Sequence, residues 1–210
     1  QVELDSVKFN DLISENLQAF VNFENDSILK LDDLNLQFKD TRTSLQGSIT
    51  AKQPVINTES ENPFDFQFSF AMNGKSKDLN ELLNTVNFEL SSGDFEFTGS
   101  YQGQAQDHSI LNSNAEGDLK LGATLVRINE TELQIPVDSL HLMIKNDLAT
   151  LDRLDVDLPG KSSIDITGTI DHLSNFINNE QLELAHTSNF MIRSPYLDSN
   201  DIAEFIGSDT

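Results

Sequence analysis

The sequence predicts an all-β protein built of antiparallel strands joined as hairpins, with a few short helices. Three observations lead to this prediction. Apolar and polar residues alternate with a period of two along most of the chain, polar turn segments separate the alternating runs, and helical patterns are few and short. Because neighbouring side chains on a strand point to opposite faces, this alternation indicates a sheet with one apolar and one wet face.

The clearest strand covers residues 64–72, where four phenylalanines and Met72 alternate with polar residues. A helix would scatter these four rings around its circumference, whereas a strand places them on one face. The shorter alternating runs are Leu34-Leu36-Phe38, Val86-Phe88-Leu90, Phe95-Phe97, Leu119-Leu121-Ala123, Leu133-Ile135-Val137, Leu140-Leu142-Ile144, Leu154-Val156-Leu158 and Ile164-Ile166.

Turns are expected where polar residues and glycine interrupt the alternation. The segments 91–94 and 159–163 each join two alternating runs, as in hairpins, and Asn73-Gly74 ends the phenylalanine strand. The polar segments 53–62 and 102–114 are predicted to be loops.

Three short helices are predicted. They cover residues 77–84, with Asp78 as a cap, residues 171–178, and residues 198–206, where Gly207 would end the helix. Around the last of these, Asp198, Asn200 and Asp201 favour helix capping over cation binding.

A recurring hairpin unit is found near residues 31–51, 84–103 and 151–177. In each unit an apolar run, a polar turn and a second run lead to a glycine, namely Gly47, Gly99 or Gly168. A glycine within a strand often marks a bend, a bulge or a close approach of two backbones. We therefore expect equivalent bends in a curved sheet, within a single β-rich region over residues 1–210 that belongs to a longer protein.

The charge and composition restrict the possible partners. A net charge of -22 disfavours binding to nucleic acids and to anionic membrane surfaces. It indicates a solvated acidic surface, with a site for calcium or a basic partner as the alternative. The chain contains no cysteine, no signal peptide and no apolar stretch long enough to span a bilayer, so any membrane anchor is expected outside this chain.

No catalytic or metal-binding pattern is found. The four histidines are far apart and share no ligand spacing, which favours ordinary surface histidines. Asp155 and Asp157 alternate with apolar residues, which favours a solvated face over a calcium loop. Because there is also no G-x-S-x-G motif, we expect neither enzymatic activity nor a cofactor.

Four segments resemble the AsmA-like family of bacterial envelope proteins. They are LDRLDVDLPGKSSIDITGTIDHLSNFI at residues 151–177, LDDLNLQFKDTRTSLQGSITA at 31–51, FSFAMNGKSKDLNELL at 68–83 and NFMIRSPYLDSNDIAEFIG at 189–207. The last two show an apolar strand that leads into a short helix. The resemblance implies an elongated, curved antiparallel sheet that forms an open β-groove, with an apolar inner face that holds acyl chains. It also implies a periplasmic protein anchored in the inner membrane, with a role in lipid transport or outer-membrane assembly and possible contacts with other envelope proteins.

The apolar face supplies the candidate binding residues. The candidates for the lining of a lipid groove are Phe64, Phe66, Phe68, Phe70, Phe88, Leu90, Phe95, Phe97, Leu119, Leu121, Leu154, Val156, Ile164 and Ile166. The same alternation would also form the core of a closed β-sandwich, such as an extracellular adhesion or carbohydrate-binding module. In either case we expect Phe66, Phe68, Phe88, Leu90, Phe97, Leu121, Val156 and Ile166 to share one face.

Overall fold

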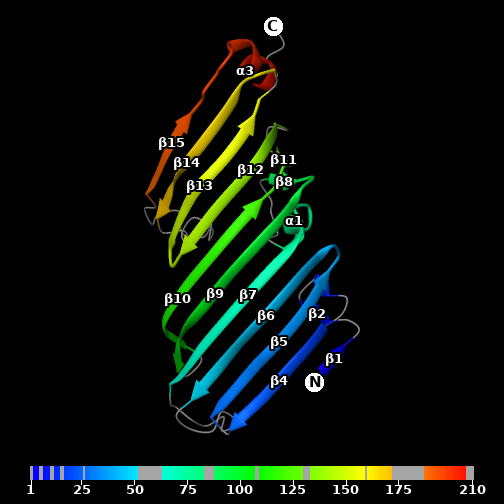
Figure 1. The fold of residues 1–210 in the computed structure, drawn as a ribbon, viewed down its shortest axis with the longest axis vertical. Coiled ribbons are helices and arrows are strands. Elements are labelled where there is room, and N and C mark those ends of the chain that lie inside the picture. Colours follow the sequence, from blue (N-terminus) through cyan, green and yellow to red (C-terminus); the bar gives the residue numbers. More distant parts are fainter. Residues whose placement is uncertain are drawn as a thin grey trace. The chain divides into compact units, whose positions relative to one another are not determined.

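A computed structural model describes residues 2–4, 7–9, 12–14, 17–25, 27–51, 63–82, 88–106, 109–129, 133–158, 160–171 and 187–206. In these ranges the chain folds into antiparallel strands and two short helices (Figure 1), which confirms the predicted all-β, antiparallel fold. The chain divides into two compact units. Unit 1 comprises residues 1–74 and 97–117, and unit 2 comprises residues 75–96 and 118–210.

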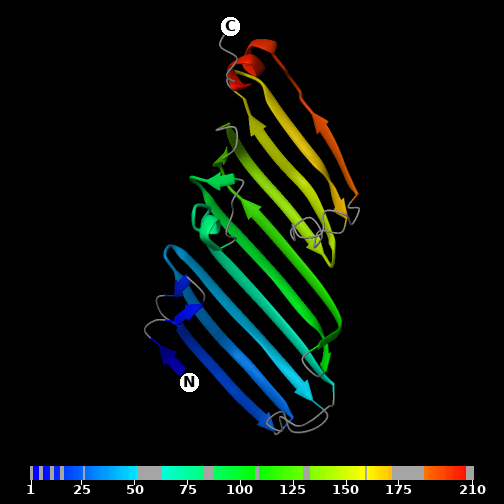
Figure 2. The ribbon, with the colours of Figure 1, turned by 180° about the vertical axis from the view of Figure 1, so that it is seen from behind.

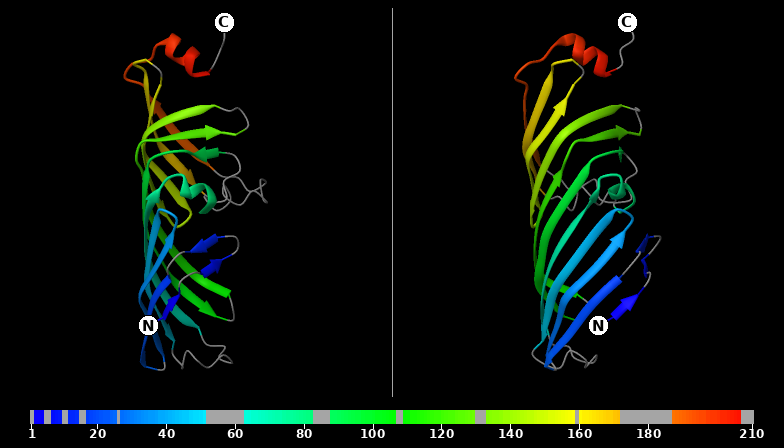
Figure 3. Two further views of the ribbon diagram at one scale, coloured as in Figure 1. Left: turned by 90° about the vertical axis from the view of Figure 1, so that its right-hand side faces the viewer. Right: turned by 45° about the vertical axis from the view of Figure 1, so that its right-hand side comes forward.

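Unit 1 is a curved sheet of long strands (Figure 3). Its hydrogen-bonded strand order is β1-β4-β5-β6-β7-β9-β10, and β2 and β3 form a separate two-stranded sheet. The last residues of β7 and β10 and the first residues of β9 belong to unit 2. The strands are β1 (Val2–Leu4), β2 (Val7–Phe9), β3 (Leu12–Ser14), β4 (Leu17–Asn25), β5 (Ile28–Phe38), β6 (Thr41–Ala51), β7 (Phe64–Lys75), β9 (Asp94–Gln106) and β10 (Ser109–Leu121).

Unit 2 combines the strands β8 and β11 to β15 with the two described helices. The order β12-β13-β14-β15 forms its main part, β11 pairs with β12, and β8 pairs with β11 (Figure 2). Its core is formed by Val137, Val156 and Leu158, against which Ile202 of the last helix packs. The elements are α1 (Asp78–Leu82), β8 (Phe88–Leu90), β11 (Thr124–Ile128), β12 (Gln134–Lys145), β13 (Leu148–Asp157), β14 (Ser163–Asp171), β15 (Ser188–Arg193) and α3 (Ser199–Ile206).

Two of the three predicted hairpin units are hairpins. β5 pairs with β6 across a turn at Lys39-Asp40, and β13 pairs with β14 across a turn in which Gly160 has a φ of 80°. The prediction for residues 84–103 is wrong, because β8 pairs with β11 and not with β9. In that region the turn residue Gly93 has a φ of 89°, and Ser91 donates its backbone N–H to Leu125 of β11 at 3.0 Å.

The two confirmed hairpins share a β-bulge beside their glycine. Leu31 lies opposite Gly47, and Leu34 lies opposite Leu45. The two residues between the leucines, Asp32 and Asp33, therefore face the single residue Gln46 of β6. In the β13–β14 hairpin, two residues of β13 again face one residue of β14, since Leu151 lies opposite Gly168 and Leu154 opposite Ile166. The extra residue keeps leucines three positions apart on one face of the sheet, where a regular strand would place them on opposite faces.

The predicted loop at residues 102–114 is wrong. β9 continues to Gln106 and β10 begins at Ser109, so most of this polar segment is strand. Backbone hydrogen bonds extend a hairpin regardless of side-chain polarity, which is why the missing apolar alternation was misleading here. The strand β7 likewise runs past Asn73-Gly74 to Lys75. The other predicted loop, at residues 53–62, lies outside the described residues.

Two of the three predicted helices are present where the chain is described. α1 begins at Asp78, and α3 begins at Ser199 after Asp198, whose Oδ1 accepts the backbone N–H of Asn200 at 2.8 Å. Asp198 thus caps α3, as predicted. Asp171 belongs to β14, and residues 172–178 of the remaining prediction lie outside the described residues, as do residues 83–87 and Gly207.

Candidate functional site

In unit 1 the aromatic candidates share one face, which we call the apolar face. On β7 and β6, Phe66 lies opposite Ile49 and Phe70 opposite Leu45. The ring of Phe66 lies 5.1 Å from the ring of Tyr101, and the ring of Phe70 lies 5.2 Å from that of Phe97. The candidates Phe64, Phe68, Phe70 and Phe97 are only half-buried, whereas Phe66 is buried.

In unit 2 the candidates also occupy one face. Val156 pairs with Val137 and Ile164, Leu154 with Ile166, and Leu90 with Val126. Asp118 contacts His141 on the opposite, polar face, so the alternating Leu119 and Leu121 point to the apolar side. Leu90, Phe95, Leu121 and Val156 are buried, Leu119, Leu154, Ile164 and Ile166 are half-buried, and Phe88 is exposed.

Phe95 is the most deeply buried of the candidates, with 1% of its surface exposed. A ring that is completely enclosed by protein packs the sheet and offers no surface to a ligand. The accessible part of the apolar face of unit 1 therefore consists of its half-buried rings, and that of the corresponding face of unit 2 consists of its half-buried aliphatic residues.

In each unit, exposed apolar side chains lie on an outer strand of the apolar face. In unit 1, Val21 and Phe23 of β4 are 43% and 54% exposed, and their register with Leu31 and Leu29 places them on that face. In unit 2, Phe190 and Ile192 of β15 are 45% and 67% exposed and lie opposite Gly168 and Ile166. Large exposed apolar patches are rare on soluble monomers and usually mark a binding surface, so these exposed side chains are candidates for one.

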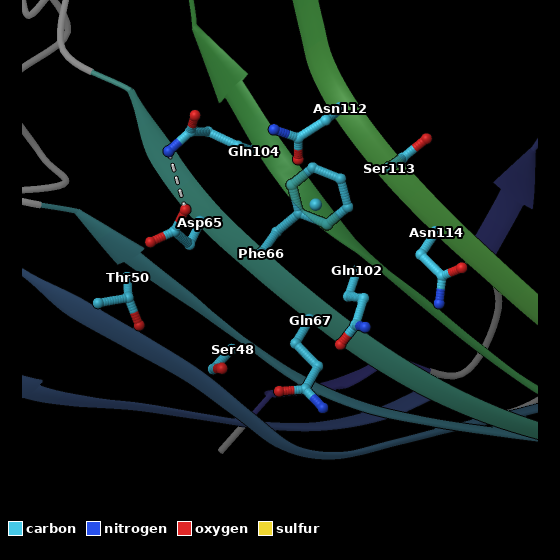
Figure 4. Close-up of a pocket in the computed structure, with 11 residues that line it drawn as sticks. Ser48, Thr50, Asp65, Phe66, Gln67, Gln102, Gln104, Asn112, Ser113 and Asn114 are labelled. Carbon is cyan, nitrogen blue, oxygen red and sulfur yellow. Dashed lines mark hydrogen bonds between the residues drawn. The ribbon is translucent and has the colours of Figure 1, made fainter.

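The opposite face of unit 1 is polar and contains a shallow hollow of about 510 Å³ (Figure 4). Ser48 lies opposite Gln67 and Thr50 opposite Asp65, and Nε2 of Gln104 donates to Oδ1 of Asp65 at 3.1 Å. These contacts place β6, β7 and β9 residues on one surface. The residues that line this first hollow are Ser48, Thr50, Asp65, Phe66, Gln67, Gln102, Gly103, Gln104, Asn112, Ser113 and Asn114.

A second hollow, of about 480 Å³, lies on the same polar face. Asn35 faces Ser44, Gln37 faces Arg42, and Arg42 faces Asn73. Ser44 and Ser48 are an even number of residues apart on β6, so both hollows open on one side of the strand. The remaining lining residues are Gln18, Leu36, Thr43 and Ala71.

On the polar face of unit 2, His141 bridges two carboxylates. Its Nε2 lies 2.8 Å from Oδ2 of Asp118, and its Nδ1 lies 3.1 Å from Oδ2 of Asp152, the bulged residue of β13. The hydrogen bond to Asp118 is the main cause of a raised His141 pKa, which burial opposes. The same bond is the main cause of a lowered pKa for Asp118, which also lies 3.4 Å from Lys120.

Hydrogen bonds to Asp201 connect the helix α3 to the β13–β14 turn. Its Oδ2 accepts the backbone N–H groups of Lys161 at 3.1 Å and Ser162 at 3.0 Å, and the Ser162 hydroxyl at 2.7 Å. The Ser162 hydroxyl in turn accepts the backbone N–H of Asp198 at 2.8 Å. The hydrogen bond from the Ser162 side chain is the main cause of a lowered pKa for Asp201.

Sequence reasoning missed the polar hollows. Six of the eleven residues that line the first hollow belong to residues 102–114, which the sequence suggested to be a loop. The alternation of Gln102 and Gln104 with the small residues Gly103 and Ala105 could have indicated a strand, had small residues been counted with the apolar ones.

Within the described part of the chain, no group of three or more acidic or histidine side chains is arranged to hold a metal ion. Neither described helix is long and apolar enough to cross a membrane. Comparison of the chain with models of protein families, with curated proteins and with solved structures finds no match.

Proposed function

We propose that this chain is a non-catalytic module of a bacterial cell envelope, of the AsmA-like kind, that binds lipid acyl chains on its apolar face. The observation that carries the proposal is the row of aromatic rings along β7. Phe64, Phe68 and Phe70 are half-buried, and the face continues to Val21 and Phe23, which are exposed at the edge of unit 1.

An acyl chain laid on this face would replace water around the half-exposed rings. The gain is roughly 25 cal/mol for each Å² of apolar surface that is covered. An acyl chain forms no hydrogen bonds, so a surface that offers only aromatic and aliphatic contacts is sufficient to bind it. A charged or zwitterionic head group would stay in water at the edge of the sheet.

The alternative of a closed sandwich requires a second sheet of comparable size over the apolar face. Among the described strands, only the short pair β2 and β3 forms a separate sheet. The incomplete burial of Phe68 and Phe70 also fits an open face better than a filled core, in which large apolar side chains are normally buried.

In this proposal the chain works in the periplasm and is attached to the inner membrane through a segment that lies outside this chain. Its partners are phospholipid acyl chains and other envelope proteins. No reaction is assigned. A lipid would move along the apolar face as its acyl chain exchanges one set of apolar contacts for the next.

Two pairs of variants test acyl-chain binding. Phe23→Asp adds a charge to the exposed part of the apolar face, and Asn22→Asp adds the same charge to the preceding residue of β4, on the polar face. Phe68→Asp and Ser69→Asp form the same pair on β7. The measurements are retention of a fluorescent fatty acid by the purified protein and the thermal unfolding midpoint.

We expect Phe23→Asp and Phe68→Asp to lose fatty-acid retention, while both control variants retain it. Phe23 is exposed, so Phe23→Asp should unfold at nearly the wild-type temperature. A wild-type protein that never retains fatty acid would overturn the proposal. So would a Phe23→Asp variant that binds it as well as Asn22→Asp does.

A further inference from the structure

We propose that the polar face of unit 1 binds a neutral, linear oligosaccharide along β6 and β7, in the two hollows described above. This site lies on the side of the sheet opposite to the apolar face and does not depend on the proposed lipid function.

The chemistry of the first hollow is that of a ligand rich in hydroxyl groups. Five primary amides line it, and each offers both donors and an acceptor; they belong to Gln67, Gln102, Gln104, Asn112 and Asn114. Figure 4 shows the glutamines and asparagines of β9 and β10 on one side of the hollow, and Ser48 and Thr50 on the other. Sugar hydroxyls also donate and accept, so they can pair with each of these groups.

The distribution of charge selects a neutral ligand. The chain contains 35 acidic residues, yet the first hollow is lined by one, Asp65, and by no lysine, arginine or histidine. An anionic polymer would meet no cation in the first hollow and a single one, Arg42, in the second, and the net charge of -22 would repel it. Asp65 already accepts a hydrogen bond from Gln104, and its remaining lone pairs are suited to sugar hydroxyls.

The hollow stands on a rigid base. Gln67 and Asp65 are held by the β6–β7 ladder opposite Ser48 and Thr50. Beneath them, Cζ of the Phe66 ring lies 2.9 Å from the position that a Cβ on Gly103 would occupy, so β7 and β9 are tightly packed. Because the backbone of a hydrogen-bonded sheet is already fixed, ligand binding has to order only the side chains, which reduces the cost of binding.

The arrangement of the two hollows indicates a linear ligand. The β6–β7 pair runs from Arg42 and Asn73 in the second hollow to Thr50 and Asp65 in the first. Eight steps of about 3.3 Å give a stripe of roughly 26 Å, and the pair Gln46 and Ser69 lies between the hollows. Such a stripe fits several sugar units in an extended chain better than a single ring.

Nuclear magnetic resonance titration of the isotope-labelled full chain tests the site. The probe is cellopentaose, a neutral, extended oligosaccharide, and glucose and tetragalacturonate are the comparison ligands. With cellopentaose at millimolar concentration we expect the side-chain amide signals of Gln67, Gln102 and Gln104 to shift in a saturable manner. Glucose and the anionic tetragalacturonate should cause much smaller shifts.

Gln67→Ala and Gln102→Ala should each weaken cellopentaose binding by about fivefold, as expected for one lost hydrogen bond. Gln134→Ala, an exposed glutamine on β12 of unit 2, is the matched control and should bind as the wild type does. Gln67→Ala and Gln102→Ala should both keep the unfolding midpoint and the fatty-acid retention of the wild type.

Unchanged spectra with cellopentaose, or shifts that are equally large in the Gln67→Ala variant, would overturn the proposal. Stronger shifts with tetragalacturonate than with cellopentaose would also overturn it, because the selection for neutral ligands would be wrong. Failure of fatty-acid retention in the wild type bears on the lipid proposal alone.

Discussion

Gly168 of β14 lies directly across the hydrogen-bonded ladder from Phe190 of β15, and Cδ1 of that ring is 2.5 Å from where a Cβ on Gly168 would be placed. Gly47 and Phe68 stand in the same relationship in unit 1, with Cδ1 at 2.2 Å. Both glycines also face a backbone oxygen of the neighbouring strand at similar distance. The glycines are therefore required by the neighbouring strand and its ring, since any side chain would push the strand away.

Alanine at Gly47 is expected to destabilise the protein by about 1–3 kcal/mol, as overpacking of a filled site does. Its Cβ would meet both the Phe68 ring and the backbone oxygen of Gln67. Gly122→Ala is the control, because the nearest atom to its Cβ is 3.7 Å away. Chemical denaturation of the two variants checks the difference, and equal unfolding midpoints would contradict the requirement at Gly47.

Deletion of Asp152 should be far more damaging than its replacement by alanine. The bulge allows Leu151 and Leu154 to share a face of the sheet. Without Asp152, the side chains of β13 on one side of the deletion would point to the opposite face, and the apolar ones among them would be exposed. Asp152→Ala keeps the bulge and removes only the contact with His141. Circular dichroism and thermal unfolding of both variants test this, and a deletion variant that unfolds like Asp152→Ala would show that the register is not fixed by the bulge.

The stability of unit 2 should decline as the pH rises above 6.5, because of His141. Its pKa is raised in the folded state above the ordinary value of 6.5. Such a group stabilises the fold fully below 6.5, and the contribution is lost as the pH rises through the raised value. We expect the loss to be about 0.5–1 kcal/mol, as for a partly exposed ion pair.

Urea denaturation between pH 5 and pH 9 compares wild type with His141→Gln, which cannot be protonated. The wild type should lose stability relative to the variant as the pH rises, and Lys145→Gln should follow the wild-type profile. A His141→Gln profile parallel to that of the wild type would contradict the prediction.

Removal of the Asp201 carboxylate should loosen α3 without unfolding the sheet. Asp201→Ala leaves the backbone N–H groups of Lys161 and Ser162 without this acceptor. We expect roughly fivefold faster hydrogen exchange of the α3 amides, whereas Asn200→Ala, an exposed neighbour, should leave the rate unchanged.

The pH dependence of α3 follows from the same contact. Because the pKa of Asp201 is lowered in the folded state, its stabilising effect is present above the ordinary value of 3.8 and is lost as the pH falls through the lowered value. Protection of the α3 amides, taken as exchange rates corrected for the intrinsic pH dependence of exchange, should therefore fall in the wild type as the pH drops below 3.8 and change less in Asp201→Ala.

The apolar half of the fold could be predicted from the sequence because alternation records which side chains are buried. The phenylalanines of β7 and the leucines of β5 and β13 are on one face as expected. The bulges could be suspected from the leucines three residues apart at 31 and 34, but only the strand register identifies them.

The failures have physical causes. Ser91 to Asp94 has the composition of a hairpin turn, yet pairing is decided by strands distant in sequence, and β8 joins β11. The polar hollow could not be foreseen, because it depends on bringing Ser48, Gln67 and Gln104 together from three strands. A polar strand carries at most a weak alternation, such as that of the glutamines with Gly103 and Ala105, so it resembles a loop until its partners are known.

The edge strand β15 also bears on the behaviour of the protein in solution. Phe190, Met191 and Ile192 are consecutive and exposed, and no acidic residue occurs between Ser188 and Arg193. Proteins commonly protect such an edge with local charges. Here the excess of 22 negative charges keeps molecules apart by long-range repulsion, which salt screens within about 8 Å at physiological ionic strength. Colloidal stability is thus a property of the entire acidic surface, and added salt or acidification should bring these edges together.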